Sequence, residues 1–197
     1  MTKLKNVALL IVFALSSLQL LPAQTKWTVD KSHTDIRFTA VHYLISEVDG
    51  EFKEFEGSVT TNSEDFTGAE VEFVANVASI NTDNERRDNH LKSDDFFNAE
   101  KYPELKFKGK IQKEGDKYHL VGDFTMRDVT KPIKFDVKYN GSVDLGERGK
   151  KAGFKITGVV DRFEYGIQFN RALETGGLVV SQEIQITCNV EMNLSKG

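Results

Sequence analysis

The chain has 197 residues, with 26 lysines and arginines against 30 acidic residues and a formal net charge of −4. An acidic protein is a poor candidate for binding nucleic acid or an anionic membrane surface, because both repel it. The one cysteine, Cys188, excludes an internal disulfide, and the alternating apolar segment around it predicts a small buried residue.

Residues 1–23 have the pattern of a secretory signal peptide. Lys3 and Lys5 form a basic start, residues 7–21 are apolar, and Ala23 offers a cleavage site. The apolar stretch is short for a membrane-spanning helix, which needs roughly 20 apolar residues. We therefore expect a protein exported to the periplasm, or secreted, whose residues 24–197 form a single domain that does not span the membrane.

From residue 24 onward, apolar and polar residues alternate, which is typical of strands with one buried face. The pattern predicts strands near residues 36–40, 55–59, 71–77, 105–113, 120–126, 133–139, 154–160 and 184–194. Turn residues at Gly115, at Asn140-Gly141 and at 146–149 predict direct hairpins between long strands. A sheet without a covering layer of helices must close or stack, so we predict an all-β, eight-stranded antiparallel barrel.

The interior of such a barrel is just wide enough to be filled by side chains or to hold one small ligand. Its inward stripes combine phenylalanines with small residues at Gly57, Ala75, Gly109, Gly122 and Gly158. This mixture suits a narrow apolar tunnel, and it equally suits close packing. The sequence leaves both alternatives open.

One segment, about residues 83–101, breaks the two-residue rhythm and predicts a short helical insert. Thr82 and Glu85 have capping-box spacing at its start. Arg86 and His90 share a helix face. The segment is then either a lid that plugs one end of the barrel, with an Asp83–Arg87 pair on its surface, or a cationic rim. A rim would hold the polar head of an amphiphile whose tail lies in the barrel.

Other chemistry is poorly supported. His33 and His42, nine residues apart, point to opposite faces of a continuous strand, and His119 is expected at a solvated hairpin. The sequence contains no HxxxH, HxH or paired-cysteine spacing that would indicate a metal site, and no GxSxG motif that would indicate a serine nucleophile. The adjacent pair Asp94 and Asp95 fits a helix start. We expect no metal site, no cofactor and no enzymatic activity.

Several ordered blocks resemble the YceI-like family, also called the polyisoprenoid-binding family. The resemblance runs from Trp27 nearly to the C-terminus. It rests on the segments WTVDKSHTDIRFTAVH, EFKEFEGSV, SINTDNERRDNHLKSDDFFNAEKYPELKF, GDFTMRDVTKPIKFDV and DRFEYGI. Three positions depart from the family pattern, with Thr34 in place of Ser, Phe124 in place of Leu and Asp128 in place of Gly.

The resemblance implies a lipocalin-like barrel that encloses an elongated apolar pocket and carries a long-chain amphiphile, such as a polyisoprenoid or fatty lipid, in the periplasm. We expect the pocket wall to contain Phe38, Phe55, Phe73, Val77, Phe107, Phe124, Phe135 and Phe154, and the rim to contain Arg86, Arg87, Asp88, His90 and His42. Asp161 and Arg162 form a structural pair or part of this rim. The alternative is a periplasmic stress or redox accessory protein whose filled barrel acts through a protein partner. A homodimer is compatible with both.

Overall fold

A computed structural model describes residues 24–169 and 178–195, so the expected signal peptide lies outside the described residues. The described chain contains one α-helix, α1 (Glu85–Lys92), and three short 3-10 helices, η1 (Val77–Ser79), η2 (Gly146–Arg148) and η3 (Arg162–Tyr165). Its strands are β1 (Thr25–Val29), β2 (Asp35–His42), β3 (Ser46–Phe52), β4 (Phe55–Thr61), β5 (Glu70–Asn76), β6 (Ile80–Asn81), β7 (Glu104–Glu114), β8 (Lys117–Met126), β9 (Val129–Asp144), β10 (Lys150–Asp161) and β11 (Val180–Leu194).

These strands form a closed antiparallel barrel of eight. The long strand β11 pairs with both β1 and β2, β4 pairs with β1, and β3 pairs with β2. Because β5 and β6 likewise pair with β4 and β3, the segments β1–β2, β3–β4 and β5–β6 are three long strands, each broken in two. The other five follow in sequence order, and the β1–β11 pairing closes the barrel. This confirms the predicted lipocalin-like, eight-stranded barrel with a short helical insert.

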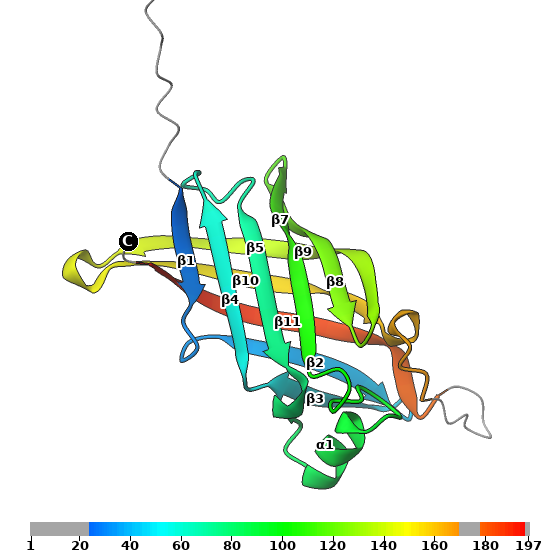
Figure 1. The fold of residues 1–197 in the computed structure, drawn as a ribbon. Helices are drawn as coiled ribbons and strands as arrows, with labels where there is room; N and C mark the ends of the chain where they lie inside the picture. Colours follow the sequence, from blue (N-terminus) through cyan, green and yellow to red (C-terminus); the bar gives the residue numbers. More distant parts are fainter. Residues whose placement is uncertain (1–23, 170–177, 196–197) are drawn as a thin grey trace, which may run out of the picture.

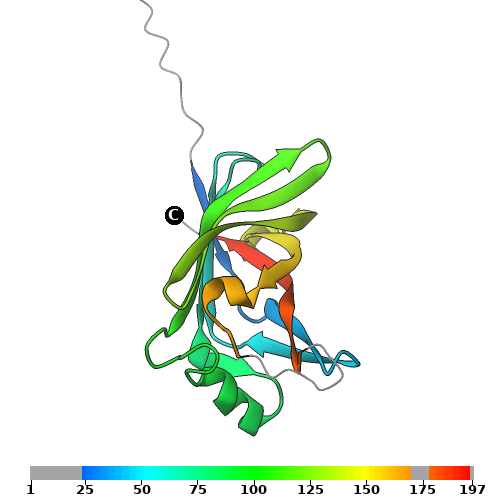
Figure 2. The same cartoon turned by 90° about the vertical axis from the view of Figure 1, so that its right-hand side faces the viewer.

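The barrel is flattened, and its two layers cross. In Figure 1, β1, β4, β5 and β7 run across β10, β11 and β2, and Figure 2 shows the same two layers from the side. Crossed packing of this kind brings the inward side chains of both layers together in one core. The helix α1 lies at one end of the barrel, near the β2–β3 hairpin.

Aromatic and apolar side chains close both ends of this core. At one end Phe66, which is 1 % exposed, packs against Trp27 and Phe154 with ring centroids 5.2 and 5.0 Å away. At the end nearer α1, Tyr165 and Ile167 are almost fully buried. The interior is therefore a space between two packed plugs.

Two glycines fix the closest approach of strands in the wall. Gly109 on β7 and Gly122 on β8 are directly paired, and a Cβ atom on Gly122 would lie 2.3 Å from the carbonyl oxygen of Lys108. A side chain there would collide with backbone, which cannot easily move. The expected Asn140-Gly141 turn is wrong, because both residues lie inside β9 at a bulge opposite Gly153. Gly141 takes the positive φ of 108° that this bulge requires.

The insert contains a shorter helix than expected, and its cap differs. The side chain of Asn84, not Thr82, caps α1 by accepting a hydrogen bond from the Arg87 N–H (3.0 Å), so the predicted capping box is wrong. Asp83, at φ 56°, bonds with Asn81, and the expected Asp83–Arg87 ion pair is not among the described contacts.

Two further expectations about charged residues are wrong. Asp94 and Asp95 follow α1 instead of starting a helix, and Asp95 lies 2.9 Å from His90 Nε2. His119 is only 7 % exposed, because the β7–β8 hairpin continues beyond it and Asp136 covers it from β9. Alternation alone cannot show that a neighbouring strand covers an outward-facing side chain.

Candidate ligand-binding site

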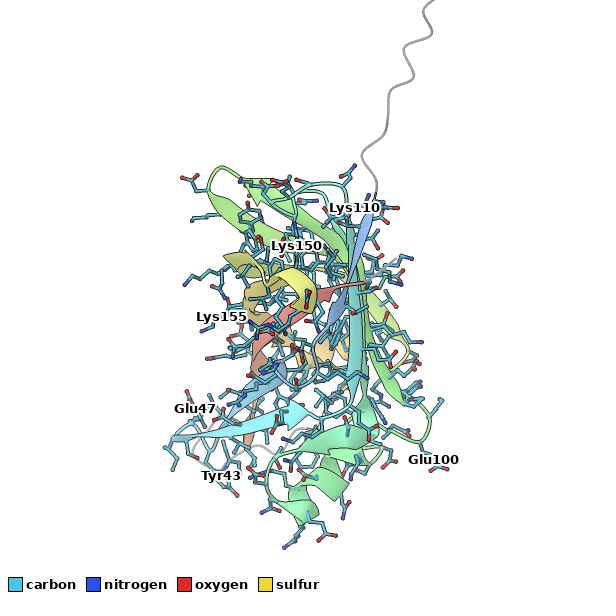
Figure 3. The ribbon with its side chains drawn as sticks, turned by 90° about the vertical axis from the view of Figure 1, so that its left-hand side faces the viewer. Tyr43, Glu47, Glu100, Lys110, Lys150 and Lys155 are labelled. Atoms are coloured by element: carbon cyan, nitrogen blue, oxygen red, sulfur yellow. The ribbon has the colours of Figure 1, made fainter. Side chains whose placement is uncertain are left out.

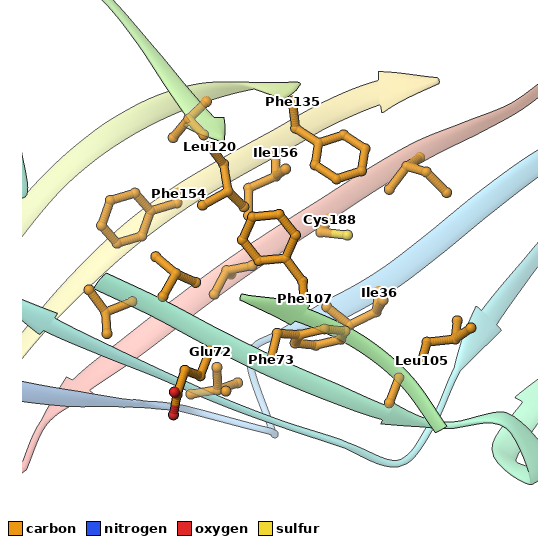
Figure 4. A pocket seen from close by; sticks show the side chains of 18 of the residues that line it. Ile36, Glu72, Phe73, Leu105, Phe107, Leu120, Phe135, Phe154, Ile156 and Cys188 are labelled. Carbon is orange, nitrogen blue, oxygen red and sulfur yellow. The ribbon is translucent and has the colours of Figure 1, made fainter. Parts of the chain in front are cut away.

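The barrel encloses an apolar cavity of about 150 Å³, which we call the central cavity. Inward side chains from both crossed layers line it, as the alternation of strand residues requires. Figure 4 shows the rings of Phe107 and Phe135 and the sulfur of Cys188 directed toward the same space. Its apolar lining comprises Val29, Ile36, Phe38, Phe52, Val59, Val71, Phe73, Ala75, Leu105, Phe107, Ile111, Leu120, Phe124, Phe135, Val137, Phe154, Ile156, Ile186, Cys188, Val190 and Met192.

The lining of the cavity includes outward-facing residues where the barrel strand formed by β1 and β2 is interrupted. Between β1 and β2 the ladder stops at the pair Thr28–Ser58 and resumes at Arg37–Glu51. Arg37, Ser58 and Glu72, which alternate outward, also line the cavity beside this interruption. The carboxylate of Glu72 points away from the cavity in Figure 4, so the space itself has an apolar surface.

Cys188 is a chemical marker of this cavity. It is buried on β11, as the sequence predicted, and burial raises the pKa of its thiol to about 12. The neutral thiol therefore dominates at ordinary pH, and thiol reactivity is suppressed because the thiolate is the nucleophile.

The inward glycines serve close packing. An added Cβ at Gly158 would lie 2.4 Å from the ring of Phe135, and one at Gly50 would lie 2.3 Å from the ring of Phe38. Each glycine leaves room for a phenylalanine ring from the adjacent strand. At these positions the alternative of close packing holds, and the remaining void is what the rings leave empty.

A second pocket, the mouth pocket, lies between the β2–β3 hairpin, α1 and the segment after η3. Its volume is about 230 Å³. Apolar side chains form most of its wall, and Arg87, His90 and His42 bring polar groups to it. The complete lining is Phe38, Ala40, Val41, His42, Val48, Thr82, Arg87, His90, Leu91, Phe96, Phe169, Val179 and Val180.

The side chain of Phe38 lines both pockets. Its ring packs on Gly50 and lies 5.8 Å, between centroids, from the ring of Phe52. The central cavity and the mouth pocket are therefore consecutive spaces along the inner face of β2, with one aromatic ring between them.

Arg87 is held in the mouth by a small hydrogen-bond network. Its Nε donates to the hydroxyl oxygen of Thr82 (2.7 Å) and its Nη2 to the Thr82 carbonyl (2.6 Å). Asp88, which is buried, accepts from the N–H and the hydroxyl of the same threonine. Asp88 thus fixes Thr82, which fixes Arg87. Nη1 of Arg87 makes no hydrogen bond to the residues that the structure describes.

The histidines of the rim are packed against aromatic rings. His90 lies edge-on to Phe96 and Phe169 at 5.0 and 5.1 Å, and its Nε2 bonds to Asp95. His42 lies against Tyr43 at 4.0 Å. Arg86 does not line the mouth pocket and instead lines a neighbouring pocket with Asn84, Arg87 and His90.

The expected site residues therefore divide into groups. Six of the eight expected wall residues line the central cavity, whereas Phe55 and Val77 are buried in the core away from it. Of the expected rim residues, Arg87, His90 and His42 line the mouth pocket, Asp88 lies behind them, and Arg86 faces outward. Their roles as ligand contacts stay predictions.

The sequence reasoning missed several lining residues. Ile36, Ile186 and Val190 share the inward parity that identified the phenylalanines, so a full reading of the alternation would have included them. Phe169 has no such signal, because it follows η3 in a segment without period-two alternation. Only the fold brings it to His90 and Phe96.

Arg162 is a structural residue. Although it is 3 % exposed, its Nε, Nη1 and Nη2 donate to the carbonyls of Ser181, Ile167 and Val180. Burial lowers the pKa of its guanidinium. Asp161 accepts hydrogen bonds from the Phe163 N–H and from Gln182 and is not hydrogen-bonded to Arg162.

One cluster has the side chains of a metal site. Ligand atoms of Asp30, His33 and Glu191 lie within 4.8 Å of one another at the interruption between β1 and β2. The ammonium of Lys151 bonds to both carboxylates and so already supplies a cation. Its hydrogen bond is the main reason that the pKa of Asp30 lies well below the usual value. The cluster joins the interruption to β10 and β11.

Among the residues that the structure describes, no helix is long and apolar enough to cross a membrane.

Comparison with known proteins adds three observations. A family model described as YceI-like domain matches residues 27–192. A UPF0312 protein of Staphylococcus aureus (strain USA300) is 35 % identical over 173 residues, which cover 87 % of this chain and 99 % of that protein. The crystal structure of the Campylobacter jejuni YCEI protein superposes with a TM-score of 0.68 at 29 % identity, covering 80 % of this chain and 90 % of the other.

A more distant structure shares the fold alone. It is a polyisoprenoid binding domain from Saccharophagus degradans, with a TM-score of 0.65 and 12 % identity, covering 86 % of this chain and 98 % of that one.

Proposed function

Because this chain belongs to the YceI-like domain family, we propose that it is an exported carrier that holds one long-chain amphiphile in its barrel. The tail lies in the central cavity, and the polar head lies in the mouth pocket. Binding of a polyisoprenoid is named for the Saccharophagus degradans domain, and a polyisoprenoid or fatty lipid is the ligand class we propose here. The periplasm is the proposed location, in keeping with the pattern of residues 1–23.

The observation that carries this proposal is the arrangement of two pockets in line. The central cavity is apolar throughout its interior, whereas the mouth pocket adds Arg87, His90 and His42 to an apolar wall. A ligand that fits both must therefore have a long apolar part and one polar end. Nη1 of Arg87 suits a head group that accepts hydrogen bonds, with an anionic head bound more strongly than a neutral one.

The energy of binding comes mainly from the tail. Each buried methylene group contributes about 0.8 kcal/mol, against which the cost of ordering the chain must be set. The central cavity of about 150 Å³ is smaller than typical ligand sites of roughly 300–1,000 Å³. A long tail therefore requires rings to rotate, and Phe38 is the ring whose rotation would join the two pockets.

Native mass spectrometry of the gently purified protein, with lipid extraction of the same sample, tests the proposal. We expect a co-purifying amphiphile at one copy per chain, and saturable uptake of a fluorescent fatty or isoprenoid probe by the delipidated protein. The absence of both a co-purifying lipid and probe uptake would contradict the proposal.

A second candidate function is favoured by the same small volume. With plugs at both ends and a cavity of about 150 Å³, the barrel could remain filled and act through a protein partner, as a stress or redox accessory protein. The two candidates differ in the probe experiment. A filled barrel takes up no probe, and substitution of Phe38 by alanine would not create uptake.

A further inference from the structure

The most exposed apolar side chains of the described structure gather at one hairpin tip. Among the described residues, five large apolar side chains are strongly exposed, and three of them are consecutive: Tyr43 (47 %), Leu44 (61 %) and Ile45 (86 %). They form the turn between β2 and β3, which we call the hairpin tip. Scattered exposed apolar residues are ordinary, whereas a contiguous group marks an interaction site.

The backbone of the hairpin tip is also unusual. Tyr43 and Leu44 have φ values of 51° and 64°, in the left-handed region that favours glycine and asparagine. Bulky side chains here cost stability, and exposed apolar side chains cost solubility. A polar turn such as Asn-Gly would avoid both costs, so neither folding nor solubility explains these residues.

The hairpin tip adjoins the mouth pocket. Val41, His42 and Val48, which flank the tip, line that pocket, and the Tyr43 N–H donates to the carbonyl of Val179 (2.9 Å) beside it. Figure 3 shows Tyr43 at the end of the hairpin on the side of the molecule that carries α1. A surface that contacts the hairpin tip therefore lies next to the mouth pocket.

We propose that the hairpin tip inserts into the interfacial region of a lipid bilayer and so docks the mouth of the barrel on a membrane. Tyrosine suits the level of the head groups, and leucine and isoleucine suit the acyl chains beneath. The inference goes beyond ligand binding, and it rests on the proposed function only for why the mouth is presented to lipid.

The size of the tip favours a bilayer over a protein partner. Three partly exposed side chains offer on the order of a few hundred Å² of apolar surface. A standard protein interface needs roughly 800 Å² from each partner. A bilayer needs no matching surface, and a small apolar group gives shallow, reversible insertion, comparable to the marginal binding of a single acyl chain.

Charge points to the same mode of binding. The tip carries no charged side chain, its neighbour Glu47 is acidic, and the whole chain has a net charge of −4. The tip itself therefore offers no electrostatic attraction to anionic lipid. We expect the full-length protein to bind phosphatidylcholine vesicles at least as well as phosphatidylglycerol vesicles, with little dependence on salt.

The test uses a reporter in the tip. In the variant Leu44→Trp, emission of the new tryptophan should shift to shorter wavelength with phosphatidylcholine vesicles and be quenched by brominated lipid, whereas Trp27 is buried and reports no change. Emission that stays unshifted at saturating lipid overturns the proposal.

A second variant separates the tip from the rest of the chain. Tyr43→Asn, Leu44→Gly and Ile45→Ser together should reduce vesicle binding about tenfold or more while leaving the melting temperature equal or higher. Val143→Ser removes a half-exposed apolar side chain at the end of β9, next to η2, and should change nothing. The turn between β9 and β10, yellow in Figure 1, lies at the opposite end of the barrel from the β2–β3 hairpin. Because all variants share one N-terminus, residues 1–23 contribute equally to each.

The outcomes distinguish this inference from the proposed function. If the triple variant takes up dissolved probe normally but no longer accepts probe from vesicles, both proposals are supported. Vesicle binding that is equal in the triple variant and the parent overturns docking alone. Self-association that light scattering shows to depend on the tip, without vesicle binding, would assign the tip to a second copy of the chain and also overturn it.

Discussion

The barrel strands β7 to β11 run without a break for 10 to 16 residues, whereas each of the other three strands is broken in two. We call the first group the unbroken wall and the second the interrupted wall. The helix α1, the hairpin tip and most of the mouth pocket belong to the interrupted wall, while the Phe135 and Phe154 side of the central cavity belongs to the unbroken wall. The comparison suggests that breaks in a ladder make room for a site that an intact barrel lacks.

Short polar side chains make these breaks possible. Where the ladder stops, Asp30 accepts from the Ser32 N–H (3.1 Å), Asn76 accepts from the Ala78 N–H (2.9 Å), and Ser79 accepts from the Glu54 N–H (3.0 Å). Such side chains replace the strand partner that a backbone N–H would otherwise need. The interrupted wall is therefore satisfied locally, at the cost of a continuous sheet.

The largest effect is expected from a pair of matched substitutions. Phe135→Ala, in the unbroken wall, removes a buried ring packed on Gly158 and should cost about 4 kcal/mol of unfolding free energy. Phe38→Ala, in the interrupted wall, should cost about half as much, because Phe38 is only partly buried. It should also speed probe uptake. Urea unfolding and stopped-flow uptake measure both effects, and equal costs with unchanged uptake would remove the distinction between the walls.

Arg162→Ala tests the strongest tie of the unbroken wall. The loss of the guanidinium leaves one buried and two partly buried carbonyls without a donor, so we expect a destabilisation of about 3 kcal/mol in urea unfolding. Arg148→Ala, at an exposed site in η2, is the control and should change stability by less than about 0.5 kcal/mol. A small effect of Arg162→Ala on unfolding, with a large one on binding, would instead make Arg162 a ligand residue.

Arg87→Ala tests the polar side of the mouth. Loss of one charge-assisted hydrogen bond should weaken binding of an anionic amphiphile about tenfold, or about 1.4 kcal/mol, and leave a neutral analogue of equal length little changed. Isothermal titration of both ligands measures the difference. Arg86→Ala, at an exposed residue that does not line the mouth pocket, is the matched control. Equal weakening of both ligands, together with a lower melting temperature, would show that Arg87 is structural.

The smallest effect concerns the ion cluster that joins the interruption to the unbroken wall. Since the pKa of Asp30 is lowered in the folded protein, mainly by Lys151, the folded state binds its proton less tightly than the unfolded chain. The stabilisation by the ionised Asp30 is fully present above the pKa of aspartate in the unfolded chain, about 3.9, and is lost as the pH falls from there toward the lower pKa of the folded protein. Asp30→Asn should cost about 1 kcal/mol at pH 7 and flatten the fall of stability below pH 5 in urea titrations. If the stability of Asp30→Asn fell with pH in parallel with that of the parent, other carboxylates would control acid unfolding.

The unbroken wall was readable from the sequence, whereas the interrupted wall was readable only in part. Alternation predicted strands near residues 36–40, 55–59 and 71–77, but not where the strands break. Alternation around Phe107, Phe124, Phe135 and Phe154 predicted both the strands and the residues that line the cavity, because inward parity persists along an unbroken strand. It failed at Asn140-Gly141, where a bulge has the same composition as a turn. It could not foresee that Asp30 to Thr34 would interrupt a strand.

The mouth depends on contacts between segments distant in sequence. The spacing of Arg86 and His90 predicted a shared helix face, whereas Arg87 and His90 are the two that line the mouth pocket. Their partners Thr82, Phe96 and Phe169 follow from tertiary packing alone. The expected cap at Thr82 was wrong for the same reason, because that side chain is used by Asp88 and Arg87. Sequence propensity alone cannot show whether a threonine side chain caps a helix or bonds to side chains that the fold brings near it.

The protection of Cys188 tests the central claim most directly, because this single cysteine lines the central cavity. Its modification by a small thiol reagent at pH 8 would be timed with and without a saturating long-chain amphiphile, with an added cysteine from Ser142→Cys on the outer surface as the control. A tail in the cavity predicts that modification of Cys188 slows about tenfold or more while the surface cysteine reacts at its former rate. An unchanged rate at Cys188, with the amphiphile bound, would contradict the placement of the tail inside the barrel.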